Sequence, residues 1–133
     1  MPLFSRLRLA LAALLLLAAT QAAAAAERRA FDAAAFAAAQ SRGAPILVEI
    51  TAPWCPTCRA QKPIIADLGA RPEHRDLVIF AVDFDSQKDT VRGFRAQSQS
   101  TLIAFRGKSE TVRSVGDTDP GSIARLLDST RPR

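Results

Sequence analysis

The chain has 133 residues, which is enough for one domain of ordinary size and too few for two. Two cysteines and one histidine exclude a disulfide-dense scaffold and a closed four-ligand zinc module, and an apolar fraction of 48% argues against disorder. The formal charge of +5 would favour a nucleic-acid partner only if the basic residues were clustered.

The first 26 residues have the pattern of a secretory signal peptide. Arg6 and Arg8 form a basic start without acidic residues, and residues 9–19 are an unbroken apolar run. The alanines at 22–26 then offer Ala-x-Ala cleavage sites. We therefore expect residues 1–26 to be removed when the protein is exported, and we expect a periplasm as the destination.

Residues 27–133 would then form the mature domain. It keeps 16 basic and 13 acidic residues, a net charge of +3, and the basic residues are scattered rather than clustered. We therefore expect no nucleic-acid partner. The alternative for the N-terminus is an uncleaved membrane anchor, since the stretch 9–26 reaches the lower length limit of a membrane span.

The mature segment predicts alternating strands and helices. The expected order is a strand at 29–31, a helix at 33–40, a strand at 46–51, a helix at 55–68, a strand at 77–84, a helix at 86–95, strands at 101–105 and 111–115, and a helix at 122–129. Strands that alternate with helices run parallel, and the turn at 106–108 makes the last two strands a hairpin. The sequence thus predicts an α/β fold with a central mixed sheet of four to five strands flanked by helices.

Four single residues refine these elements. Asp32 is a suitable N-cap for the first helix, and Phe36 is its main apolar anchor. Pro63 lies inside the second helix, where it should produce a kink. His74 falls in a polar connection, so we expect it to be solvated and without a role.

The segment Trp54-Cys55-Pro56-Thr57-Cys58 carries the candidate chemistry. It follows a buried strand and opens a helix, so Cys55 would lie among free backbone N–H groups that stabilise a thiolate. Two cysteines three positions apart on a first helical turn are close enough to form a disulfide. Cys55 would be the attacking nucleophile, and Cys58 would resolve a mixed disulfide.

This part of the chain resembles the thioredoxin family, and the resemblance covers residues 31–129. It rests on Ile46-Leu47-Val48-Glu49-Ile50, Ala52-Pro53-Trp54-Cys55 with Cys58, Pro63, Val82-Asp83-Phe84-Asp85, Thr101-Leu102-Ile103-Ala104-Phe105 and Val115-Gly116, in that order. The resemblance implies a thioredoxin-like fold and a thiol–disulfide oxidoreductase that needs no cofactor.

Glu49 matches the position of the family's buried acid, where aspartate is more usual. The resemblance implies that its carboxyl accepts the proton of the inner thiol, with a pKa raised by burial. A strand residue on a solvent face is the alternative. The family often supplies a lysine partner from the next strand, but Ala81 stands there. We therefore expect Glu49 to lack that cation and to be protonated at rest.

The substrate-binding surface is expected to include Trp54, Pro56, Thr57, Ser100 and Thr101. The family usually has a cis-proline at the position of Ser100, and it pairs extended partners with the backbone of that loop. A cis bond to a residue other than proline costs about 3–4 kcal/mol, so we expect the bond before Ser100 to be trans. This departure puts the family's docking mode in doubt for the present chain.

The uncharged pair between the cysteines, Pro56-Thr57, favours a reductant or a mid-potential exchanger over a strong oxidant. The expected partners are exported proteins with disulfides and a membrane protein that conducts thiol electrons, with the chain itself a monomer. The main alternative is a Cu(I)-binding or delivery module that uses the same two thiolates. A permanent structural disulfide is a further alternative, although so short a loop gains little from cross-linking.

Overall fold

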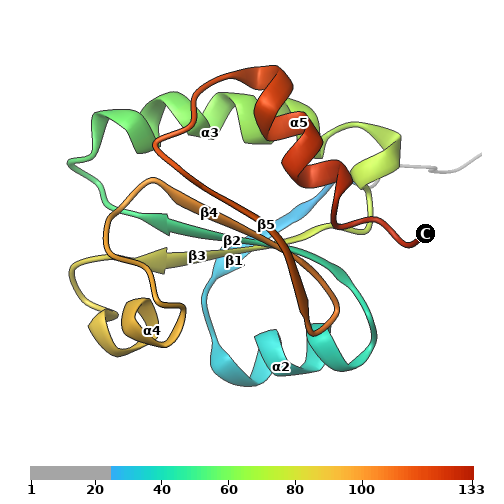
Figure 1. Ribbon diagram of the computed structural model, residues 1–133, viewed down its shortest axis with the longest axis horizontal. Helices are drawn as coiled ribbons and strands as arrows, with labels where there is room; N and C mark the ends of the chain where they lie inside the picture. The colour runs from blue at the N-terminus through green and yellow to red at the C-terminus, as the bar shows by residue number, and fades with distance from the viewer. Residues whose placement is uncertain (1–24) are drawn as a thin grey trace, which may run out of the picture.

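The described part of the chain, residues 25–133 of a computed structural model, places a mixed sheet between two layers of helices (Figure 1). In chain order the elements are β1 (Glu27–Ala30), α2 (Ala33–Ser41), β2 (Pro45–Thr51), α3 (Pro56–Gly69), a 3₁₀ turn (Pro72–His74), β3 (Val78–Asp83), α4 (Lys88–Gly93), β4 (Thr101–Arg106), β5 (Ser109–Val115) and α5 (Pro120–Asp128). Helices α3 and α5 cover one face of the sheet, and α2 and α4 cover the other.

The sheet has the strand order β1-β3-β2-β4-β5. Strands β1 and β2 both run parallel to β3, whereas β4 is antiparallel to β2 and β5 is antiparallel to β4. The predicted fold class, mixed sheet and terminal hairpin are therefore confirmed. The crossover helices return each parallel strand to the same end, so β2 and β3 both end at the left of Figure 1.

Both faces of β2 are buried, which explains why its sequence is a continuous apolar run. Val48 and its alternate neighbours pack toward α2 and α4, whereas Leu47 joins the core under α3 and α5. Side chains alternate across a strand, so Glu49 shares the face of Leu47. A solvent-facing Glu49, the alternative left open by the sequence, is therefore wrong, and its carboxyl lies under α3.

Phenylalanine rings hold α2 against the sheet. Phe36 is the centre of this cluster, with ring centroids 5.4–5.6 Å from those of Phe31, Phe80, Phe94 and Phe105. Most of these pairs meet edge to face, the arrangement that aromatic quadrupoles favour. The predicted anchoring role of Phe36 is confirmed, and so is the N-cap, because the carboxylate of Asp32 accepts the N–H of Ala35 at 2.8 Å.

His74 corrects a prediction. It is 3% exposed rather than solvated. Its Nδ1 lies 2.9 Å from the carbonyl oxygen of Leu68, and its Nε2 lies 3.2 Å from the carboxylate of Asp128. The 3₁₀ turn folds the ring back over the end of α3, where it also meets α5. The polar sequence around His74 gave no indication of this contact, because the partners are 6 and 54 positions away.

The predicted signal peptide falls almost wholly outside the described residues, which begin at Ala25. Ala26 donates its N–H to the carbonyl of Gly69 at 2.8 Å, directly before β1 starts. Within residues 25–133, no helix is long and apolar enough to cross a bilayer. Export and cleavage of the first 26 residues stay predictions.

Candidate active site

The two cysteines form a disulfide at the start of α3. Their Cα atoms are 5.3 Å apart, and Cys55 is the N-cap of the helix. Its Sγ accepts the N–H of Cys58 at 3.1 Å, and Pro56 occupies the first helical turn, where a missing N–H does no harm. The predicted placement is therefore confirmed. After reduction, this N–H and the helix dipole would stabilise a thiolate at Cys55.

Both cysteines are deeply buried, Cys55 as much as Cys58. Cys55 is 2% exposed and Cys58 is 3% exposed. They form a small apolar cluster with Ala52, against which Phe84 packs. A disulfide on another molecule can therefore reach the sulfurs only by fitting closely against the surrounding surface.

Trp54 lies on the rim of this site. Its side chain is 53% exposed, the largest exposed aromatic group of the described residues, and its indole N–H donates to the carboxylate of Asp85 at 2.6 Å. Asp85 stands in the turn after β3 and donates its own N–H to Asp83 at 3.1 Å. Backbone and side-chain hydrogen bonds from Ser86 lower the pKa of Asp83. The indole is thus fixed in orientation while its face stays open to a partner.

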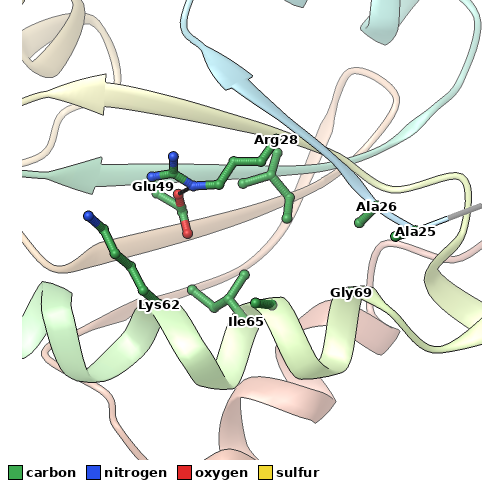
Figure 2. Close-up of a pocket in the computed structure, with 9 residues that line it drawn as sticks. Ala25, Ala26, Arg28, Glu49, Lys62, Ile65 and Gly69 are labelled. Atoms are coloured by element: carbon green, nitrogen blue, oxygen red, sulfur yellow. Dashed lines mark hydrogen bonds and ion pairs between the residues drawn. The ribbon is translucent and has the colours of Figure 1, made fainter.

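Glu49 is buried on the α3 side of the sheet, and its charged partner was not foreseen. The Nε of Arg28 donates to Oε2 of Glu49 at 2.8 Å (Figure 2). The family's lysine is absent, as predicted, because Ala81 stands at that position, but Arg28 supplies a cation from β1 instead. Ala81 does lie beside Glu49 in the sheet, as aligned, but Arg28 opposes Ile79 two residues earlier. The small alanine leaves room for the arginine to reach across β3.

This ion pair lines a cavity of about 380 Å³. Its lining includes apolar side chains of α3 and β3, Ile65 and Ile79, together with Ala26 and Gly69. Lys62 extends over the same cavity from α3 (Figure 2). The structure thus places the ammonium of Lys62 on the side of the buried acid.

Burial is the main influence on the acidity of Glu49 and raises its pKa above the ordinary value of 4.5. Arg28 opposes this through its charge and its hydrogen bond, and Lys62 opposes it through charge. The predicted direction is confirmed, although the carboxylate has a cation beside it. A carboxyl with a raised pKa is suited to exchange a proton with a thiol near neutral pH.

We expect Arg28→Met to make the fold more sensitive to alkaline pH. The folded-state pKa of Glu49 is raised, so the folded state holds this proton more tightly than the unfolded state does. The free energy of unfolding must therefore fall as pH rises from the unfolded-state value through the folded-state pKa. Without Arg28 the pKa should rise further. The side chain of Arg28 is 44% exposed, so we expect only about 1 kcal/mol of additional loss at pH 8.

Urea unfolding at pH 4 and pH 8 measures this loss. Arg29→Met is the matched control, because Arg29 stands on the same strand and pairs at 3.6 Å with the exposed Glu27 instead. Glu49→Gln should flatten the pH dependence in either background. Equal pH profiles for the two arginine variants would contradict the role assigned to Arg28.

Ser100 lies in the loop that leads into β4, with its backbone in the left-handed region at a φ of 57°. The described residues contain no cis peptide bond, so the bond between Gln99 and Ser100 is trans, as predicted. The Ser100 hydroxyl donates to the carbonyl of Gln99 at 2.6 Å, and the Thr101 hydroxyl donates to the carbonyl of Ser98 at 2.8 Å. The loop thus binds its own carbonyls with its own side chains.

The structure brings the cysteines and the predicted substrate-binding residues to one end of the sheet, whereas Glu49 lines a separate cavity beneath α3. Thr101 opposes Ile50 in β2, directly before the turn that carries Trp54 and the cysteines. Pro56 is exposed and Thr57 half-buried on the first turn of α3. The sequence missed Arg28, Asp85 and Gln61. Arg28 and Asp85 come from other elements of the fold, and Gln61 lies on α3 itself but bonds to loops 39 and 56 positions away.

Within residues 25–133, no three His, Cys, Asp or Glu side chains are grouped so as to hold a metal ion. At this site the described residues offer the two cysteine sulfurs as soft donors. This donor set is compatible with Cu(I), which accepts two soft thiolates. The copper alternative therefore depends entirely on the same pair that forms the disulfide.

Comparison with known proteins agrees with this geometry. Residues 27–129 match the protein family described as Thioredoxin. A thioredoxin of Mycobacterium bovis is 30% identical over 92 residues, which is 69% of this chain and 78% of that protein. A Thioredoxin H-type of Brassica campestris is 33% identical over 82 residues, and the match spans 62% of this chain and 65% of the relative. The structure of Trxlp from Edwardsiella tarda EIB202 is 42% identical, with a TM-score of 0.74 over 76% of this chain and 98% of that chain.

Proposed function

Because this chain belongs to the thioredoxin family, we propose that it is a thiol–disulfide oxidoreductase that reduces or exchanges disulfides in exported proteins. The observation that carries the proposal is the Cys55–Cys58 disulfide at the N-terminus of α3. A helix N-terminus stabilises the thiolate, and the pair can open or close within a single helical turn. Two sulfurs in this arrangement are sufficient for the chemistry.

The reaction starts from the reduced pair. The Cys55 thiolate attacks one sulfur of the substrate disulfide, which forms a mixed disulfide and releases the other substrate sulfur as a thiolate. The Cys58 thiol loses its proton, to Glu49 directly or through water, and its thiolate attacks the Cys55 sulfur. The substrate's second sulfur leaves, and Cys55–Cys58 becomes a disulfide. Two electrons have then passed to the substrate.

The rim residues would position the substrate. Trp54 is fixed by Asp85 and offers an open aromatic face, and Pro56 and Thr57 surround the first turn of α3. The loop that carries Ser100 and Thr101 borders this surface on the other side, although the two residues are themselves buried, at 7% and 1% exposed. The N-terminal pattern of residues 1–26 supports export to a periplasm. There, an electron-conducting membrane thiol protein would have to reduce the pair again.

The test uses the mature chain with insulin and dithiothreitol at neutral pH. We expect the protein to accelerate insulin precipitation well above the rate with dithiothreitol alone. The reduction potential of the cysteine pair then decides the direction, since a value near about −270 mV indicates a reductant and one near about −120 mV indicates an oxidant. Stoichiometric retention of Cu(I) without turnover would contradict the proposal and favour the copper module.

A further inference from the structure

Gln61 is a polar residue on the buried side of α3, where the neighbouring positions are apolar. It is 4% exposed, and it lies three residues after Cys58, on the same side of the helix. Ile65 and Leu68 follow on this side and belong to the core. A polar side chain is unfavourable in such a place unless hydrogen bonds compensate for its burial.

The side-chain amide of Gln61 joins two loops that are distant in the sequence. Its Nε2 donates to the carbonyl of Ser100 at 3.2 Å and to the carbonyl of Asp117 at 2.9 Å. An amide nitrogen has two hydrogens, one for each carbonyl. Both partners can only accept, so the site requires a donor, and a carboxylate of the same shape would repel both oxygens.

The two loops also contact each other beside the disulfide. Gly116 donates its N–H to the carbonyl of Ser100 at 2.9 Å, so this carbonyl receives two donors. Ser100 directly precedes Thr101, which opposes Ile50 two residues before Ala52 of the cysteine cluster. Figure 1 shows the start of α3, the entry to β4 and the exit from β5 at the same end of the sheet.

We propose that Gln61 is a positioning residue that sets the affinity for protein disulfides, an inference that rests on the proposed function. Its amide holds the segments 98–100 and 116–117 in one arrangement around the disulfide. Ser100 adopts a left-handed backbone that a serine rarely holds by itself, so the segment needs external support. The hydrogen bonds from Gln61 and Gly116 supply this support.

A fixed loop lowers the entropy that must be lost when a protein partner docks. A small disulfide must also fit against the surface around the sulfurs, but it covers much less of these loops than a protein does, so its rate should depend far less on their arrangement. We therefore expect the two classes of substrate to differ. The Michaelis constant for a protein disulfide should depend on the Gln61 amide, whereas the rate with a small aromatic disulfide should depend on it far less.

The experiment compares wild type with Gln61→Met and Gln61→Glu, using insulin and 5,5′-dithiobis(2-nitrobenzoate) as the two substrates. We expect the KM for insulin to rise about five- to tenfold in both variants, the effect of losing one or two hydrogen bonds, with kcat nearly unchanged. The rate with the small disulfide should stay within about twofold of wild type. Circular dichroism confirms that each variant is folded.

Gln87→Met is the matched control. Its amide also joins two backbone segments, because it accepts the N–H of Asp83 at 2.9 Å and donates to the carbonyl of Phe31 at 3.5 Å. It does not touch Ser100 or Asp117, and we expect its insulin KM to equal that of wild type. An unchanged insulin KM in the Gln61 variants, or an equal loss with both substrates, would overturn the positioning role.

A measurement on the wild-type chain keeps the inference testable if the variants do not fold. The Gly116 amide should exchange its hydrogen slowly, because it is bound to Ser100 within the structure that Gln61 holds. Exchange as fast as in an unprotected loop would overturn the inference. Wild type that exchanges slowly but fails to reduce insulin would instead contradict the proposed function alone.

Discussion

Replacement of Cys55 by serine should lower the rate of insulin reduction by at least about 10³-fold. The thiolate is the nucleophile, and a serine hydroxyl at the N-terminus of α3 stays protonated at neutral pH. The fold should survive, because Cys55 and Cys58 form a separate small cluster beside the main cores. The measurement is the insulin assay with dithiothreitol, and the reduced wild-type protein is its reference.

Cys58→Ser is the companion variant, and it should behave differently. Its Cys55 can still attack, but no thiol remains to resolve the product, so a mixed disulfide with the substrate should accumulate. Mass spectrometry under non-reducing conditions detects this species directly. Activity retained by the Cys55→Ser protein, or a mixed disulfide formed through Cys58 in that protein, would contradict the assigned order of attack.

Phe36→Ala should lower the free energy of unfolding by about 3 kcal/mol. Phe36 touches four other rings, and its removal would leave a void between α2 and the sheet. A small domain has only about 5–15 kcal/mol of stability, so the melting temperature should fall by roughly 12 °C or more. Thermal unfolding followed by circular dichroism measures the change.

Val112→Ala on β5 is the control, since Val112 is 41% exposed and its truncation should change stability by no more than about 0.5 kcal/mol. Phe36→Leu should recover part of the loss. Because the cluster lies on the α2 side of the sheet, away from α3, the folded Phe36→Ala protein should keep its insulin activity at low temperature. A loss no larger than that of Val112→Ala would show that the cluster does not support the fold.

Local sequence patterns were sufficient for much of the architecture. The continuous apolar runs of β2 and β3, Asp32 before α2, and the turn between β4 and β5 each depend on near neighbours. Short-range stereochemistry therefore predicts them, and the order of elements then restricts the sheet to a few topologies. The cysteine pair was predicted for the same reason, since both residues lie on one turn of one helix.

The environment of Glu49 could not be predicted in this way. Whether its strand face is open or covered depends on α3, which packs over it only in the folded protein. Its partner Arg28 belongs to an edge strand and reaches it past Ala81, so the pairing depends on the strand order as well as on the residue types. The resemblance to the family correctly placed Ala81 beside Glu49, where a lysine is usual, but it could not show that Arg28 supplies a cation from another strand.

His74 and Gln61 show the same limit. Both have polar side chains in polar or mixed sequence surroundings, and each is buried with a hydrogen-bond partner more than 30 positions away. The sequence by itself determined that this chain folds as an α/β domain with one exchangeable disulfide, because those properties follow from local periodicity and spacing. The tertiary structure alone decided which charges and amides surround that disulfide, because hydrogen bonds and ion pairs are formed between segments that only the folded chain brings together.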